Sequence, residues 1–244
     1  MRVRLTLEYD GSGFRGWAAQ PGLRTVEGEL RRALGELYDS FDSLSVAGRT
    51  DTGVHALGQV ASVDVDGGPP AARAGEALNA VLPDDVSVVR MEEAAPDFDA
   101  RHSARSRSYR YRIYRRSAPS PFEAQRSWWM PRPLDSEALG RAAAFLAGQH
   151  DFRAFTPTET QHQAFRRNVL RAEWLERGDH LDFEIEADSF LRHMVRTLVG
   201  TMVDLGPDRL PALLEGAERS KAGRTAPPWG LYLKRVSYPD ASRV

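Results

Sequence analysis

The stretch from Ala47 to Ala56 gathers most of the side chains in this sequence that could perform chemistry together. It holds Arg49, Asp51 and His55, with two glycines and two threonines among them. The segment is too polar for a core strand and too rich in glycine for a helix, so it is predicted to be a loop between two strands. Because loops held by a rigid sheet often carry catalytic groups, Asp51 and Arg49 are the first candidates for a functional pair.

Asp51 has three interpretations from the pattern alone. It could close an Asx turn on its own backbone, a common use of an aspartate in a loop. It could be a nucleophile, because a guanidinium such as that of Arg49 would keep its carboxylate ionised near neutral pH. The tripeptide Asp51-Thr52-Gly53 also matches the aspartic-protease motif. That chemistry needs two carboxylates sharing one proton, whereas the chain has no second such tripeptide and Arg49 would oppose the shared proton.

Neither a metal nor a cofactor is expected. The histidines that invite a metal interpretation are His55, His150, His180 and His193. No pair of them has the spacing of a zinc-binding helix motif, and the chain contains no cysteine. The absence of cysteine also excludes disulfides and thiolate nucleophiles.

A glycine-rich segment, residues 10–17, carries Phe14, Arg15 and Trp17. Its Gly-x-Gly-x-x-Gly spacing resembles a dinucleotide fingerprint, but no helix opens directly after it, and Pro21-Gly22 breaks the chain instead. We therefore interpret Phe14, Arg15 and Trp17 as a basic and aromatic surface.

The bulk composition is that of a globular protein, with 41% hydrophobic and 27% charged residues among 244. The N-terminus lacks the apolar core of a signal peptide, and no run approaches the ~20 apolar residues of a membrane span. A cytoplasmic protein without membrane contact is expected. The net charge of −1 argues against a nucleic-acid partner. Residues 101–116, however, contain seven arginines and no acid, which suits phosphate contacts or simply reflects genomic base composition.

Hydrophobic periodicity predicts an α+β fold. Strands are expected at 2–9, 44–47, 59–65, 86–91, 106–114, 168–176, 180–187 and 230–237, and helices at 26–38, 71–81, 136–147 and 189–205. The order in the first half resembles a ferredoxin-like unit, and the second half is similar. We predict two ferredoxin-like or RRM-like subdomains, residues 1–103 and 104–244. Their antiparallel sheets are expected to form a continuous sheet around a central cleft, with helices on the outer face.

Two elements of the second half carry further candidates. On the strand at 106–114, Tyr109 lies on one face and Arg110 on the other, so tyrosines interleaved with arginines could stack bases or could form an ordinary amphipathic strand. On the helix at 189–205, Arg192 and Arg196 stand four residues apart on one face. From the pattern alone, Arg196 is a solvated charge.

Taken together, these motifs resemble the TruA family of tRNA pseudouridine synthases over nearly the whole chain. The segments that carry the resemblance are, in order, 7–17, 47–56, 79–86, 98–101, 107–111, 150–152, 187–196 and 226–233. Several motifs in the family's order are more specific than any single motif. The sequence departs from the family pattern at Thr52, where alanine is usual, and residues 206–224 match loosely.

The resemblance implies a tRNA-modifying isomerase without a cofactor, acting as a homodimer on uridines 38, 39 and 40 of the anticodon arm. It identifies Asp51 as the catalytic aspartate, Tyr109 as the residue that stacks on the target base, and Arg196 as the partner of the aspartate. Arg49 then becomes an RNA contact. The expected substrate-binding residues are Arg15, Arg49, His55, Arg107, Tyr109, Arg110 and Leu231.

The implied chemistry agrees with these residue types. Isomerisation requires cleavage of the glycosidic bond, rotation of the uracil and rejoining through carbon five, so a carboxylate could add to the base or act at the ribose. The target base must also be extruded from a stem-loop and held. The remaining rival is a tRNA-binding protein of the same fold that has lost catalysis, and the intact Asp51, Tyr109 and Arg196 argue against it.

Overall fold

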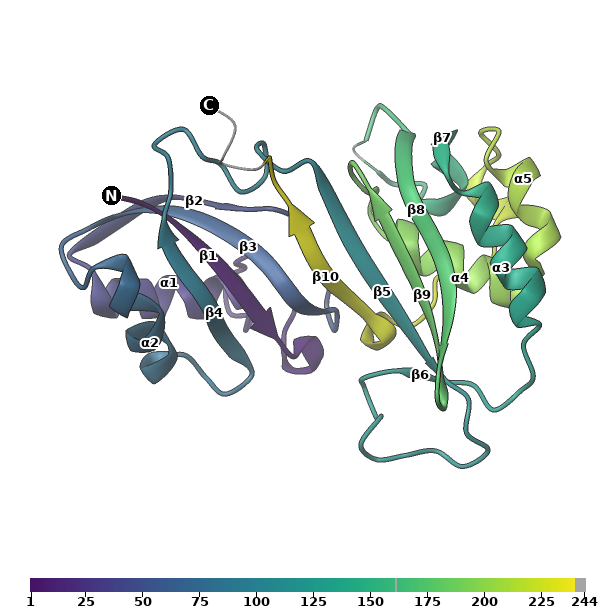
Figure 1. Ribbon diagram of the computed structural model, residues 1–244, viewed down its shortest axis with the longest axis horizontal. Coiled ribbons are helices and arrows are strands. Elements are labelled where there is room, and N and C mark those ends of the chain that lie inside the picture. Colours follow the sequence, from purple (N-terminus) through teal and green to yellow (C-terminus); the bar gives the residue numbers. More distant parts are fainter. Residues whose placement is uncertain (161, 240–244) are drawn as a thin grey trace. The chain divides into compact units, whose positions relative to one another are not determined.

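The computed structural model describes residues 1–160 and 162–239, and it divides into two compact units (Figure 1). The first comprises Met1–Arg105 with the chain from Tyr232 onward, and the second comprises Ser106–Leu231. The predicted mixed α+β class is confirmed. The cleft expected between the subdomains stays a prediction. Within the described ranges, no helix has the length and apolar character needed to cross a membrane.

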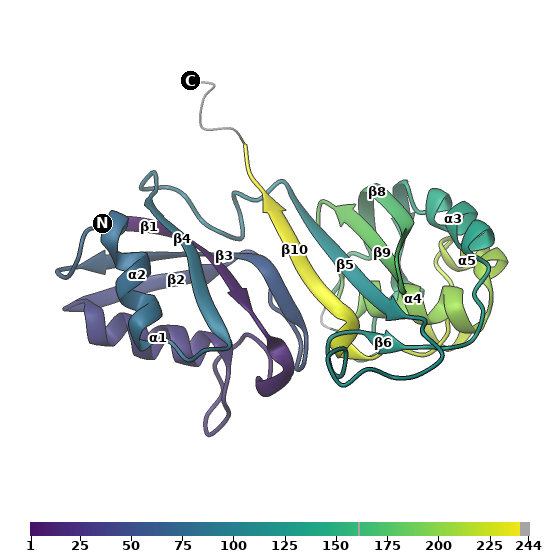
Figure 2. The same cartoon turned by 60° about the horizontal axis from the view of Figure 1, so that its bottom comes forward.

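The first unit has a ferredoxin-like core, as the sequence predicts. Its elements are β1 (Arg2–Tyr9), α1 (Val26–Leu37), β2 (Ser40–Val46), β3 (His55–Asp66), α2 (Ala71–Val81) and β4 (Val86–Glu93). The strands β4, β1, β3 and β2 are neighbours in that order, and each pair is antiparallel. The two helices contact each other and cover one face of this sheet (Figures 1 and 2). This βαββαβ order is that of a ferredoxin-like unit.

Local sequence signals explain these elements. In β1 the side chains of Val3, Leu5 and Leu7 are buried, and those between them are partly exposed, so the alternation gives the strand one apolar face. α1 begins after Thr25, whose hydroxyl accepts a hydrogen bond from the Gly28 amide at 3.2 Å. That contact satisfies one of the backbone donors that a helix leaves unpaired at its start.

The last strand of the chain departs from the prediction. β10 (Leu231–Ser237) runs parallel to β3, with Tyr232 opposite His55, so this part of the sheet is not antiparallel. It also groups with the first unit, although it falls within the predicted second subdomain. The reason is the length of β3, which begins at His55 rather than residue 59. Its early residues extend past the end of β2 and leave an edge for β10 to pair with.

The second unit contains a strand and helix order like that of the first up to its second helix, with additional short elements. Its elements are β5 (Ser106–Tyr114), β6 (Trp128–Trp129), α3 (Ser136–Phe145), β7 (Gly148–Asp151), β8 (Arg166–Arg177), β9 (His180–Ala187), α4 (Met194–Asp204) and α5 (Leu210–Leu213). The strands β5, β9, β8 and β7 are neighbours in that order and pair antiparallel, while β6 pairs parallel with β5. The order β5-α3-β8-β9-α4 is a second βαββα arrangement.

Several features of this unit differ from the sequence prediction, which contains neither β6, β7 nor α5 and begins α4 too early. α4 starts at Met194 rather than at residue 189, because His193 has a φ of 62°, in the left-handed region that a right-handed helix cannot include. β7 was not predicted, since four residues of mixed polarity give no alternating pattern.

Candidate active site

Asp51 lies in the predicted loop, between β2 and β3, where the chain makes a tight turn. The amide of Val54 donates to the carbonyl oxygen of Asp51 at 3.1 Å. Gly53 has a φ of 77°, which a residue with a side chain adopts only at a cost. Thr50 and Val54 are buried, whereas the side chain of Asp51 is partly exposed. The turn is therefore anchored on both sides and presents the carboxylate at the surface of the unit.

The glycine-rich segment braces this turn. A Cβ on Gly11 would lie 2.1 Å from the carbonyl oxygen of Val54, and a Cβ on Gly16 would lie 2.8 Å from that of Thr50. Trp17 donates its backbone amide to the Thr50 carbonyl at 3.0 Å. The glycines of the apparent dinucleotide motif thus permit close contact between two backbone segments, and they explain the spacing without a nucleotide.

The expected basic and aromatic surface on this segment is only partly present. Arg15 is exposed, but Phe14 and Trp17 are buried in the core. The ring of Phe14 is covered by the guanidinium of Arg24, whose Cζ lies 4.2 Å from the ring centroid. The prediction was wrong for both aromatic residues because glycine-rich sequence marks a loop but does not show whether its aromatic side chains turn inward.

Arg49 does not pair with Asp51. Its side chain is exposed, and it forms no ion pair or hydrogen bond within residues 1–160 and 162–239. The same holds for the side chain of Arg15 in those ranges. Both guanidiniums are therefore available to a phosphate, which agrees with their predicted role as RNA contacts.

His55 is held inside the first unit. Its Nδ1 accepts a hydrogen bond from the Gly11 amide at 3.1 Å, and its ring stacks on Tyr232 with centroids 4.5 Å apart. The Asp10 carboxylate lies 3.3 Å from the same nitrogen. These contacts fix the ring of His55 within the first unit, and its expected contact with substrate stays a prediction.

Tyr109 is fixed in β5 as the alternation predicts. Its side chain is buried together with those of Tyr111 and Ile113, on one face of the strand. The edge of Phe190 meets its ring at a centroid distance of 4.9 Å and an angle of 78°. An edge-to-face contact of this kind restrains the orientation of the ring. The same strand holds Arg107, whose guanidinium donates to the carbonyl oxygen of Asp188 at 3.0 Å.

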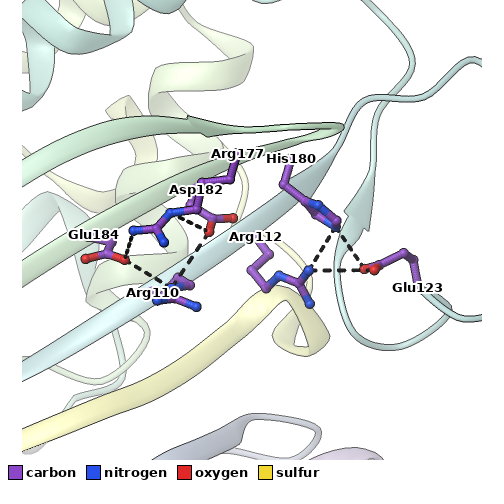
Figure 3. A network of polar contacts seen from close by, with 7 residues as sticks. All are labelled: Arg110, Arg112, Glu123, Arg177, His180, Asp182 and Glu184. Carbon is purple, nitrogen blue, oxygen red and sulfur yellow. Dashed lines mark hydrogen bonds and ion pairs between the residues drawn. The ribbon is translucent and has the colours of Figure 1, made fainter.

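Arg110 belongs to an internal network on β5 and β9, shown in Figure 3. Its Nε donates to Glu184 at 3.1 Å and lies 3.7 Å from Asp182. Arg177 reaches the same two carboxylates, at 3.1 Å and 3.5 Å. Arg110 thus already compensates two acids in its own unit, and its expected contact with substrate phosphate stays a prediction.

The same network ties a long loop to the sheet (Figure 3). Glu123, in the segment between β5 and β6, lies 3.1 Å from Nε2 of His180 and 3.6 Å from Arg112. Burial acts against ionisation of Glu123, but the nearby His180, Ser127 and Arg112 outweigh it and lower the pKa. Burial raises the pKa of Asp182 despite the nearby arginines. The network therefore stabilises the second unit rather than offering a free basic patch.

Arg196 lies in the first turn of α4 and is oriented by the chain that returns beside the helix. Its Nε donates to the carbonyl oxygen of Ala226 at 2.8 Å, and the Ala226 amide donates to the Arg196 carbonyl at 3.1 Å. The helix approaches this segment closely because Gly200 has no side chain. A Cβ there would lie 2.0 Å from the carbonyl oxygen of Arg224. The sequence pattern did not predict that the Ala226 carbonyl orients Arg196.

The expected catalytic residues are divided between the units. Asp51 belongs to the first, and Tyr109 and Arg196 belong to the second. Leu231, which was expected to bind substrate, also belongs to the second unit and is buried at the start of β10.

Two further residues near Asp51 were not predicted from the sequence. Tyr9 and Gln59 are buried polar residues that hydrogen-bond to the Asp51 loop, but the strand pattern marks Tyr9 as ordinary core.

Comparisons with known proteins agree over the length of the chain. Residues 142–239 match the family model described as tRNA pseudouridine synthase. The chain is 44% identical over 243 residues to a tRNA pseudouridine synthase A of Moorella thermoacetica, covering 97% of this chain and 99% of the relative. It is 42% identical over 247 residues to the protein of that name in Bacillus subtilis, covering 98% and 100%.

Proposed function

The chain belongs to the tRNA pseudouridine synthase A family, and from this premise we propose that Asp51 is the nucleophile acting on uridines 38, 39 and 40 of the anticodon arm. As a member of the family, the protein is an isomerase that acts on uridines of tRNA. The product of such an isomerisation contains the same atoms as the substrate, bonded in a different order. No oxidation or group donor is needed, so we propose that the reaction proceeds without a cofactor.

The observation that carries the proposal is the anchoring of the Asp51 turn. Thr50 and Val54 are buried, and Gly11 and Gly16 pack against the backbone of the turn. A nucleophile must meet its target within a fraction of an ångström, and a fixed turn supplies that precision. The partly exposed Asp51 is the reactive group that this turn presents.

In the proposed reaction, the Asp51 carboxylate attacks either the uracil ring or C1′ of the ribose. Either route breaks the bond between N1 and C1′, lets the uracil turn, and joins C5 to C1′. Asp51 is then released, the C5 proton is lost to solvent, and N1 takes up a proton from solvent. Attack requires an ionised carboxylate. We assign Arg196 to that task, because its Nε bond to Ala226 orients a planar guanidinium whose charge and geometry suit a carboxylate.

Tyr109 is proposed to stack on the extruded base. Its ring is already held by Phe190, so stacking on RNA requires little further ordering of the side chain. Arg15 and Arg49 are proposed phosphate contacts, because both side chains are exposed and have no partner in the described ranges. We further propose a cytoplasmic homodimer, in line with the other expectations from the family.

The test is tritium release from tRNA labelled at C5 of uracil. The wild-type protein should release tritium, and Asp51→Asn should bind the same tRNA but release none. Asp97→Asn is a matched control, because Asp97 is an exposed aspartate of the same unit without a polar contact in the described ranges. Release by Asp51→Asn at the wild-type rate would exclude Asp51 as the nucleophile. Binding without release by the wild-type protein would favour the catalytically inactive rival.

A further inference from the structure

Beneath the Asp51 loop, three polar side chains are buried where an apolar core would be expected. Gln59 is 0% exposed, Tyr9 is 3% exposed and Thr50 is 7% exposed. Gln59 and Tyr9 come from adjacent strands, β3 and β1, whose other buried side chains are largely apolar. Burying polar groups is unfavourable unless each finds a partner. Their partners therefore indicate what the cluster does.

These side chains form a connected chain of hydrogen bonds that ends on the loop. The hydroxyls of Tyr9 and Thr50 lie 2.7 Å apart, and Nε2 of Gln59 donates to the Tyr9 hydroxyl at 3.3 Å. The same Nε2 donates to the carbonyl oxygen of Gly48 at 2.7 Å. Oε1 of Gln59 accepts from the Val60 amide at 3.2 Å. The loop is thus held at two points, three residues and one residue before Asp51.

The strands are irregular at this place. Leu7 pairs with Gln59 but Tyr9 pairs with Ala56, so β3 carries one residue more than β1 between these two pairs. Such a bulge redirects side chains and is common beside active sites. Here the bulge lies between the pairs that contain Gln59 and Tyr9, and these two side chains hydrogen-bond to each other beside the Asp51 loop.

We propose that Tyr9, Gln59 and Thr50 are positioning residues that fix the Asp51 loop for catalysis. The proposal rests on the proposed role of Asp51. A hydrogen-bonded network in a core is more directional than apolar packing, because each bond fixes an angle as well as a distance. Removing one hydroxyl should leave the fold in place and widen the range of positions of Asp51. Burial raises the pKa of Tyr9 to about 12, so its hydroxyl keeps its proton even at alkaline pH.

The test compares variants that keep or lose one hydroxyl. Thr50→Val preserves the shape of the side chain and removes the hydroxyl, whereas Thr50→Ser retains it. Tyr9→Phe removes the other hydroxyl. The matched control is Tyr38→Phe, because Tyr38 is a buried tyrosine of the same unit whose hydroxyl donates to Pro69, away from the loop. For each variant, kcat and KM with tRNA are measured together with the thermal unfolding midpoint.

Thr50→Val and Tyr9→Phe should lower kcat by about 10- to 100-fold with little change in KM, the effect expected of a misplaced catalytic group. Thr50→Ser should restore most of kcat, and Tyr38→Phe should retain it. The double variant Thr50→Val, Tyr9→Phe should lower kcat little further than either single variant, because each change already removes the hydrogen bond between the two hydroxyls. The inference is overturned if both variants keep the wild-type kcat, or if Tyr38→Phe loses as much kcat at the same unfolding midpoint. Failure of the wild-type protein to form pseudouridine would instead contradict the proposed function itself.

Discussion

Gly16 and Thr50 lie in backbone contact, although 34 residues separate them in the sequence. A Cβ on Gly16 would stand 2.8 Å from the carbonyl oxygen of Thr50 and 3.3 Å from the carbonyl carbon of Asp51. Gly16 also has a φ of 91°, which disfavours any side chain. The turn that presents Asp51 thus depends on a glycine from a separate loop, and this dependence can be tested.

Gly16→Ala should lower kcat by at least about tenfold, because the new methyl group must push the Thr50–Asp51 backbone away. Gly22→Ala is the matched control. Gly22 has a φ of 72°, but a methyl group added there would meet nothing within 4 Å. Both variants should lose about 1–2 kcal/mol of unfolding free energy to the left-handed conformation. Only Gly16→Ala should lower kcat and reduce the unfolding free energy further. Equal kcat values for the two variants would show that the contact between Gly16 and the Thr50–Asp51 backbone does not control the position of Asp51.

Arg196→Lys should lower the single-turnover rate by at least about tenfold, because lysine lacks both the Nε donor that binds Ala226 and the planar fork. Binding of tRNA should change much less. Arg192→Lys is the control, since Arg192 is exposed, stands four residues earlier, and forms no ion pair or hydrogen bond in the described part of the chain. Similar losses in both variants would indicate that the two arginines act only through general charge.

Much of the local structure could be predicted because its signals are local. β1, α2 and β5 have the bounds expected from periodicity, and the side chains of Thr25 and Asp135, both common helix-capping residue types, cap the helices that follow them. The ferredoxin-like order of the first unit then followed from the order of its elements.

The contacts that build the site could not be predicted in this way. Tyr9 and Gln59 are 50 residues apart and meet through a bulge, which no periodic pattern reveals. Arg110 was expected on a free basic strand, but its acid partners lie on a strand more than 70 residues later. A single sequence shows which side chains are charged, whereas their availability depends on what the fold places opposite them.

Arg49, which is exposed, and Arg110, which is paired with acids, should therefore differ in their effect on the salt dependence of tRNA binding. Arg49→Met should reduce the slope of log affinity against log salt concentration by about 1, because one phosphate contact is lost. Arg110→Met should leave that slope unchanged. It should instead lower the unfolding free energy by about 3 kcal/mol, since Asp182 and Glu184 lose a partner in a largely buried network. A reduced slope for Arg110→Met would return Arg110 to the RNA contacts.

The buried hydroxyl of Tyr9 should make the protein sensitive to high pH. Burial raises its pKa from 10.0 to about 12. Between these values the unfolded chain releases the phenolic proton while the folded protein retains it, so unfolding becomes easier as the pH rises. The stability that this proton provides is fully present below pH 10 and is lost as the pH approaches 12.

Tyr9→Phe has no such proton to lose. At pH 8 it should be less stable than the wild-type protein, because the hydrogen bonds to Thr50 and Gln59 are missing. Between pH 10 and 12 the unfolding free energy of the wild-type protein should fall by about 3 kcal/mol more than that of the variant. The difference in unfolding free energy between the two proteins should therefore change over this range. Urea unfolding of both proteins across this range measures this difference. If the unfolding free energies of the two proteins changed in parallel with pH, the Tyr9 hydroxyl would not be held in the buried network. The proposal that this network positions Asp51 would then be contradicted.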